Sequence, residues 1–368
     1  SICAAICYAN LKNRLQDGFH YIPKRAGSIN EETKYVLQHF GVEPPEYAED
    51  AGAQVKDIAF RRTAGVSGHI SLKKAWELMK TENVMTLAVT SASDKLEGLI
   101  ITGDIAESYM DVYDNHILSR ARTQYKNIVE TLNGTLLAGN EHAYFLRGKV
   151  VVATGSRDVI EECIESDDLV IVGDRDETHI CALEENASCM VVTGGTQVSA
   201  QVLEMANRRD CVVIITPYDT FTAARLINQS MPIKYFMKKE NFVTFDIDDY
   251  VDEVREVMSK KRHRDFPVLD DQRRYLGMVS RRNLLNMHKK KLILVDHNEK
   301  SQAIDGIEGA EILEIIDHHR LGSLETMSPV FFRNQPLGCT STIVYQMYCE
   351  SGIEIEEKIA GLLLSAIL

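Results

Sequence analysis

Residues 292–299 read LILVDHNE and residues 312–320 read ILEIIDHHR. Each segment is a short apolar run that ends in carboxylate and imidazole side chains. In an open parallel sheet, ligands gather at the carboxyl ends of the strands. The two segments therefore predict buried strands of a parallel α/β domain with a polar site at their ends.

The polar side chains at these strand ends are suited to a divalent transition metal. They are Asp296, His297, Asn298, Asp317, His318 and His319. Carboxylate plus imidazole suits Mn²⁺, Fe²⁺, Co²⁺ or Zn²⁺, and the lack of nearby thiol pairs disfavours a structural zinc site. A single Asp-His-His triplet arises by chance on many surfaces, whereas two such clusters on successive strands are much stronger evidence for a metal site.

Upstream of these strands, a unit of helix, strand, acidic turn, strand and helix occurs twice. The first copy has segments at 70–79, 85–89 and 96–105, and the second has them at 249–258, 266–269 and 275–284. The unit resembles the CBS domain, a module that usually pairs with a second copy. The resemblance implies that the pair binds adenine nucleotides in its clefts.

The nucleotide signature of this module is a hydroxyl residue after a strand, followed three positions later by Asp or Asn. In the second copy Ser280 and Asn283 satisfy it, so the hydroxyl suits phosphate and the amide suits the ribose. In the first copy Asp104 is present, but Ile101 stands at the hydroxyl position. We expect one competent cleft and one doubtful cleft; the alternative is that these side chains only cap helices.

The region between the copies predicts a small parallel α/β unit. After helical sequence at 117–132, strands are expected at 149–153, 169–172, 189–192 and 211–215, alternating with helices. This insert resembles the DRTGG domain, although Val191 and Val192 replace the Asp-Arg of that motif. Its turn at Thr193, Gly194 and Gly195 is either an anion-binding turn or a tight turn without a ligand.

The chain as a whole resembles the family II inorganic pyrophosphatases of the DHH phosphoesterase superfamily. The resemblance rests on VDHNE at 295–299, IDHHR at 316–320, GCTST at 338–342 and the apolar segments at 1–11 and 359–368. It is closest to the regulated subtype, in which a CBS pair interrupted by a DRTGG domain is inserted into the DHH domain. The expected fold class is α/β, with a split and incomplete parallel-sheet DHH domain.

The expected domain boundaries follow from this organisation. They are 1–54 for the first part of the DHH domain, 55–111 for the first CBS repeat, 112–237 for the DRTGG-like domain, 238–288 for the second CBS repeat and 289–368 for the second part of the DHH domain.

The resemblance also implies an activity: hydrolysis of pyrophosphate to two phosphates, with Mn²⁺ or Co²⁺ plus Mg²⁺. Asp296 would bridge two metals, His318 would ligate one of them, and His319 would hydrogen-bond the substrate phosphate. Asp317, His297 and Asn298 would orient these groups from behind. AMP, ADP, ATP or a diadenosine polyphosphate would regulate the rate through the CBS pair.

Three features of the family are missing from the chain. A G-H-x-x-P-D-x-D segment is expected just before Ser1, a Ser-Asp pair just after Leu368, and a substrate-gripping domain beyond it. Two remaining ligands, Asp296 and His318, do not enforce the coordination of a metal pair. The expectation is therefore a chain cut at both ends and inactive by itself.

The composition limits the kinds of binding partner and cellular location that we expect for the chain. Acidic residues outnumber basic ones by 54 to 41, which gives a net charge of −13 and argues against a broad nucleic-acid surface. No apolar run approaches the roughly 18–20 residues of a membrane span. The eight cysteines contain no C-x-x-C pair, as suits a cytoplasmic protein. A homodimer is the default for paired CBS modules.

Two other functions remain open. The chain is alternatively an adenine-nucleotide sensor whose DHH remnant is only a scaffold, or another DHH phosphoesterase that acts on polyphosphate or a cyclic dinucleotide. The Asp-His-Asn-Glu cluster at 296–299 favours the pyrophosphatase.

Overall fold

The computed structural model describes residues 1–48, 50–110, 114–155, 157–285, 287, 289–322, 325–326 and 328–368. The chain forms two compact units. Unit 1 comprises Ser1–Ala59, Ile247–Arg262 and Arg281–Leu368; unit 2 comprises Phe60–Asp246 and His263–Ser280. The expected boundary at 111–112 and the expected end of the second repeat at 288 fall outside the described residues.

Unit 1 is built on a three-stranded parallel sheet in the order β15-β16-β17. The strands are β15 (Lys291–Val295), β16 (Glu311–Asp317) and β17 (Phe331–Asn334), and β1 (Lys24–Arg25) pairs separately with β2 (Glu46–Tyr47). The helices are α1 (Ile2–Leu15), α2 (Glu31–His39), α11 (Val251–Lys260), α12 (Arg281–Leu285), α13 (Thr340–Ser351) and α14 (Glu357–Ile367).

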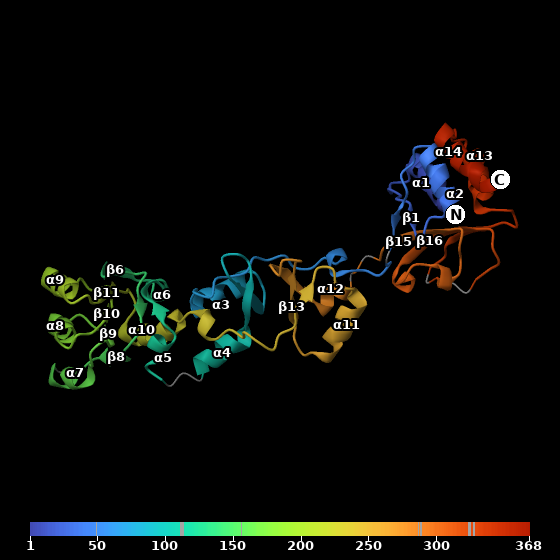
Figure 1. The fold of residues 1–368 in the computed structure, drawn as a ribbon. Helices are drawn as coiled ribbons and strands as arrows, with labels where there is room; N and C mark the ends of the chain where they lie inside the picture. The colour runs from blue at the N-terminus through green and yellow to red at the C-terminus, as the bar shows by residue number, and fades with distance from the viewer. Residues whose placement is uncertain are drawn as a thin grey trace. The chain divides into compact units, whose positions relative to one another are not determined.

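The core of unit 1 lies where α1, α13 and α14 pack together (Figure 1). Apolar residues recur along α1 at helical spacing, so Cys3, Cys7 and Leu11 share its buried face. The fully buried Tyr348 of α13 donates its hydroxyl to the carbonyl of Cys7 at 2.9 Å. This packing holds α13 against the sheet, because Ile316 of β16 belongs to the same cluster.

Unit 2 contains a five-stranded sheet in the order β6-β11-β10-β9-β8. Its strands are β6 (Thr135–Ala138), β8 (Val150–Ala153), β9 (Leu169–Val172), β10 (Cys189–Val192) and β11 (Val212–Ile215). The helices around it are α5 (Ile117–Arg120), α6 (Tyr125–Thr131), α7 (Arg157–Cys163), α8 (Asp176–Glu184), α9 (Ala200–Arg208) and α10 (Thr220–Leu226). Strands β9 and β10 are completely buried, which explains their uninterrupted apolar sequence.

The repeated segments form matching hairpins in unit 2. The first copy has α3 (Leu72–Thr81), β3 (Thr86–Thr90), β4 (Leu96–Ile101) and α4 (Thr102–Met110); the second has β12 (Phe245–Asp246), β13 (Asp265–Leu269) and β14 (Tyr275–Ser280). The remaining strands, β5 (Thr123–Gln124) and β7 (Tyr144–Phe145), pair with each other. Helix α3 begins at Ser71, whose side chain accepts a hydrogen bond from the amide of Lys74 at 3.1 Å.

The structure differs from the sequence-based expectation for the insert in two places. The helix expected over 117–132 is interrupted, because Arg122 adopts a φ of 54° and separates α5 from β5 and α6. The sheet is not purely parallel either, since β6 pairs antiparallel to β11 at one edge. The strands expected at 149–153, 169–172, 189–192 and 211–215 are all present, to within one residue.

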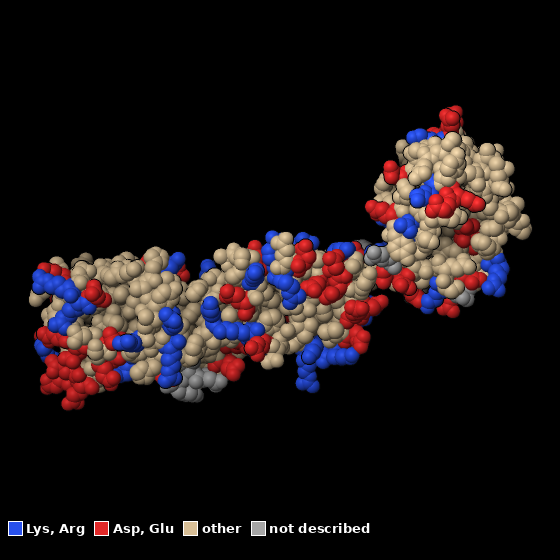
Figure 2. Space-filling model, viewed as in Figure 1, with Lys and Arg blue, Asp and Glu red and all other residues tan. Residues whose placement is uncertain are grey.

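Charge is distributed unevenly over the surface. Lysine, arginine and acidic side chains are interspersed over both units, and acidic side chains gather near α7 (Figure 2). Helix α7 carries Asp158, Glu161 and Glu162, all exposed. Within the described residues, none of the helices combines the length and the apolar character needed to cross a bilayer.

Candidate metal centre

Asp296 lies directly after β15, at the end of the unit 1 sheet. Its backbone has a φ of 71°, and its amide donates to the carbonyl of Ile316 at 2.8 Å. One carboxylate oxygen accepts the hydroxyl of Thr340 at 2.5 Å, and the other accepts a hydrogen bond from the nitrogen of Ser1. The unusual backbone conformation thus turns the carboxylate toward the beginning of α13.

The Thr340 hydroxyl, which donates to the carboxylate of Asp296, favours the charged form of that carboxylate and opposes the effect of burial on its pKa. A charged carboxylate is the form that binds a divalent cation.

His318 faces Asp296 from the end of β16. Its Nδ1 lies 2.9 Å from the carbonyl of Leu337, so Nδ1 carries the proton and donates it there. Its Nε2 lies 3.5 Å from an oxygen of Asp296, with its lone pair free for a ligand. This is the arrangement by which proteins orient a metal-binding imidazole.

Asp317 is fully buried and acts as an acceptor for the loop that follows β16. One of its oxygens accepts the amide of His318 at 2.8 Å, the amide of His319 at 3.3 Å and the Nδ1 of His319 at 2.7 Å. The other oxygen accepts the side-chain amide of Asn298. Asp317 therefore sets the direction of both histidines without facing solvent itself.

His319 is half exposed, and its Nε2 remains for a ligand because Nδ1 is committed to Asp317. Ligand atoms of Asp296, His318 and His319 all lie within 4.8 Å of one another. Three donors this close fit the coordination sphere of one Mn²⁺, Co²⁺ or Zn²⁺ ion. The sequence grouped Asp296 with His318 only; the structure also places His319 among the donors.

Asn298 links the two strand ends. It is 4% exposed; its Nδ2 donates to Asp317 and, at 2.9 Å, to the carbonyl of Arg320, and its Oδ1 accepts the amide of Gly322. His297 lies differently: its Nδ1 is 3.2 Å from the carbonyl of Val295. Burial lowers the pKa of His297, which favours a neutral ring outside the donor group.

Asn298→Ala should destabilise the protein, because it leaves buried partners of Asn298 without a hydrogen bond. We expect the free energy of unfolding to fall by about 1–3 kcal/mol. Urea denaturation followed by circular dichroism measures the change, with His297→Ala as the matched control from the neighbouring position. A loss no greater than about 0.5 kcal/mol, as for an ordinary surface substitution, would contradict the linking role of Asn298.

Sequence reasoning missed three contributors to this site. Thr340 holds Asp296, the carbonyl of Leu337 holds His318, and the side-chain amide of Asn334 donates to the carbonyl of His319 at 2.7 Å. The GCTST segment that contains Thr340 indicated the family resemblance, but it did not indicate the hydrogen bond from Thr340 to Asp296. Backbone carbonyls such as that of Leu337 leave no signal in a sequence.

The predicted nucleotide residues have structural partners of their own. Asp104 is buried, accepts the amide of Ile101 at 2.8 Å and lies 3.2 Å from the Nζ of Lys238. The side-chain amide of Asn283 donates to the carbonyl of Ala59 at 2.8 Å. Ser280 ends β14 opposite Asp265 of β13.

The turn after β10 uses its donors within the protein. The amides of Gly194 and Gly195 donate to the carbonyls of Tyr218 and Thr216 at 2.7 and 2.8 Å. The Thr193 hydroxyl donates to the carbonyl of Val172 at 2.9 Å. Both glycines have positive φ, of 78° and 65°. This geometry favours the tight turn over the anion-binding turn.

A parallel sheet with carboxylate and imidazole donors at its strand ends suits a divalent metal, and comparisons with known proteins identify the family of the chain. A cobalt-dependent inorganic pyrophosphatase of Clostridium perfringens is 42% identical over the whole chain, which covers 67% of that protein. A probable manganese-dependent inorganic pyrophosphatase of Thermotoga maritima is 37% identical over the same extent. The chain belongs to the manganese- or cobalt-dependent inorganic pyrophosphatases.

The two other predicted domain types are confirmed. The DRTGG domain model matches residues 127–230, and the CBS domain model matches residues 233–289. The crystal structure of the CBS and DRTGG domains of the Clostridium perfringens pyrophosphatase, in complex with the activator diadenosine tetraphosphate, has a TM-score of 0.60 and 36% identity. It covers 62% of this chain and all of that structure.

Proposed function

We propose that this chain carries part of the metal centre of an enzyme that hydrolyses pyrophosphate to two phosphates. The strongest support is the geometry of His318. Its Nδ1 is hydrogen-bonded to the carbonyl of Leu337, which leaves its Nε2 directed at the carboxylate of Asp296. Mn²⁺ or Co²⁺, together with Mg²⁺, would neutralise phosphate charge and acidify the attacking water.

The roles of the chain's own residues follow from their contacts. Asp296 and His318 hold the cation, and Thr340 keeps Asp296 in place. His319 is the most exposed member of the group, so its Nε2 is the nitrogen that reaches a phosphate oxygen and hydrogen-bonds the leaving phosphate. Asp317 accepts the Nδ1 proton of His319 and thereby keeps the ring in the required orientation.

We further propose the layout of a DHH domain, comprising residues 1–54 and 289–368, that is interrupted by a CBS pair and a DRTGG domain. The support comes from unit 1, where both ends of the chain pack into one core around α1, α13 and α14. A cytoplasmic homodimer is part of the same proposal, and size measurement by light scattering tests the dimer.

Regulation by adenine nucleotides is the second part of the proposal. The regulatory region of the Clostridium perfringens enzyme binds diadenosine tetraphosphate, and its CBS and DRTGG domains align with this chain at 36% identity. We assign nucleotide recognition to Ser280 and Asn283 of the second repeat. Asp104 has the same role in the first repeat, where Ile101 offers no hydroxyl.

Ser280→Ala and Asn283→Ala should each weaken the binding of diadenosine tetraphosphate by about tenfold, because each removes a hydrogen bond to a phosphate or a ribose. Titration calorimetry on the whole chain measures the affinity. Ser93→Ala, in an exposed turn, is the matched control. Unchanged affinity in both variants would remove these residues from the nucleotide site.

The alternative is a nucleotide sensor whose DHH remnant is only a scaffold. It is favoured by the share of this chain, 62%, that aligns with a purely regulatory region. Tight Mn²⁺ binding that depends on Asp296 would argue against it, since a mere scaffold has no need to retain a metal.

A further inference from the structure

Unit 2 contains a cavity of about 410 Å³ whose lining combines cations and aromatic rings. It lies between the loop before α3, the turn after α5, strand β7 and the segment around Tyr235. The side chains that matter here are His69, Arg120, Arg122, Tyr144, Lys234 and Tyr235. None of them belongs to the metal centre or to the proposed CBS signatures, and the volume lies within the usual range for small-ligand pockets.

The cations that line the cavity differ in their ion pairs. Arg120 is paired with Asp114 at 2.5 Å. Among the residues that the structure describes, Arg122 and Lys234 form no ion pair with a carboxylate. Two unneutralised cations that line one cavity attract an anion, and a guanidinium beside an ammonium is well suited to phosphate.

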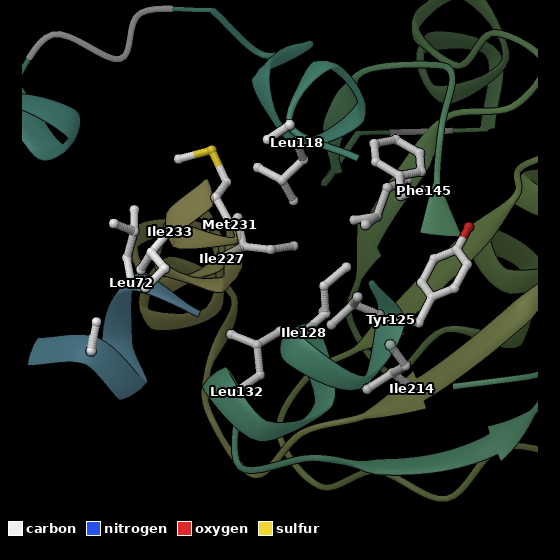
Figure 3. Packing of buried hydrophobic residues seen from close by; sticks show 14 of the residues in the cluster. Leu72, Leu118, Tyr125, Ile128, Leu132, Phe145, Ile214, Ile227, Met231 and Ile233 are labelled. Atoms are coloured by element: carbon white, nitrogen blue, oxygen red, sulfur yellow. The ribbon is translucent and has the colours of Figure 1, made fainter. Parts of the chain in front are cut away.

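The walls of the cavity are held by the fold. Residues 123–124 pair with residues 144–145, and the amide of Lys234 donates to the carbonyl of Gly68 at 2.9 Å. Beneath them lies a buried cluster that includes Leu118, Phe145 and Ile233 (Figure 3). Each of these is one or two positions from a lining residue, so the backbone around the cavity is anchored in the core.

Arg122 has a conformation that an arginine adopts only at a cost. Its φ of 54° is in the left-handed region, where a glycine or asparagine is favoured. Strain of this kind often accompanies function, because the surrounding structure then holds a side chain where it is needed. Here it brings the Arg122 side chain to the cavity.

The aromatic rings of the cavity indicate what the ligand carries besides phosphate. Tyr144 and Tyr235 line the same cavity and are 41% and 48% exposed. Exposed tyrosine rings next to cations provide a stacking surface for a planar base. We propose that this cavity is a nucleotide site separate from the CBS clefts, in which Arg122 and Lys234 bind the phosphates and a tyrosine stacks on the base.

Hydrogen–deuterium exchange on the whole chain tests the proposal, because it locates each site separately. With ATP in a chelating buffer, we expect slower exchange in residues 118–124 and 232–236. The double variant Arg122→Gly/Lys234→Gln should abolish this protection and leave any protection around residues 280–283 unchanged. Lys126→Gln/Lys239→Gln, which removes the same charge from exposed lysines outside the cavity, should retain it.

A melting experiment and two further ligands separate the proposed site from misfolding of the variant and from binding of phosphate alone. Glycine adopts the backbone of Arg122 without strain, so Arg122→Gly should melt no lower than the parent. Inorganic tripolyphosphate should protect the same segments at least about tenfold more weakly than ATP, and adenosine should not protect them. Protection that is absent in the parent or survives in the double variant overturns the site; equal protection by tripolyphosphate overturns the role of the base. If ATP protects residues 118–124 and 232–236 of the parent but not residues 280–283, the result counts against the CBS proposal instead.

Discussion

Asp296→Asn is expected to lower the affinity for Mn²⁺ by at least about 100-fold, more than any other single conservative change. The substitution keeps the shape of the side chain and its acceptor for the Thr340 hydroxyl, but it removes the negative charge. Carboxylate charge is the main attraction for a divalent cation among the donors of Asp296, His318 and His319. Titration calorimetry with MnCl₂ measures the loss.

The control for this variant is Asp271→Asn, the same substitution in an exposed turn. It should leave Mn²⁺ binding unchanged. His318→Gln should resemble Asp296→Asn, because Nε2 is the other donor directed at the site. Mn²⁺ affinity in Asp296→Asn within about threefold of the parent would show that the ion binds elsewhere, because the loss of even an outer partner costs more than that.

Asp317→Asn has the second largest expected effect, and it acts on stability as well as on metal binding. The buried carboxylate accepts hydrogen bonds from His318, His319 and Asn298. An asparagine places an amide donor against other donors on one side, and a buried group without a partner is costly. We expect the free energy of unfolding to fall by about 2–4 kcal/mol and the Mn²⁺ affinity to fall about 10- to 100-fold.

Exchanging the side chains of positions 298 and 317 separates the effect of Asp317→Asn on stability from its effect on metal binding. In Asn298→Asp/Asp317→Asn the amide and the carboxylate trade places, so the hydrogen bond between them is restored while the bond from His319 to a carboxylate is not. The double variant should recover part of the stability but little of the metal affinity. If Asp317→Asn alone unfolds at the same urea concentration as the parent, the buried carboxylate does not organise the loop.

The elements that sequence predicted well are those whose pattern is local. The buried strands β9 and β10 and the strands β15 and β16 are short apolar runs with clear ends, and they are found where expected. Strand β17 (Phe331–Asn334) was missed because it is short and half exposed. The antiparallel edge strand β6 alternates in exposure, and its direction depends on its pairing with β11.

In the metal site, too, features that depend on local sequence were predicted, and features that depend on tertiary packing were not. Asp296, Asp317 and His318 were predicted from two strand ends, since parallel strands bring their carboxyl ends to one edge. The hydrogen bond from Thr340 to Asp296 joins residues 44 positions apart and depends on how α13 packs against the sheet. The turn at Thr193 also could not be decided in advance, because the partners of its amides come from residues 216 and 218.

One measurement tests the proposed function directly: the release of phosphate from pyrophosphate with Mn²⁺ by a chimaera. This chain replaces the matching part of the Clostridium perfringens enzyme, to which it is 42% identical. We predict that the chimaera hydrolyses pyrophosphate and that Asp296→Asn lowers its rate at least about 100-fold. A folded, Mn²⁺-loaded chimaera without activity, or one whose rate is indifferent to Asp296→Asn, would contradict it.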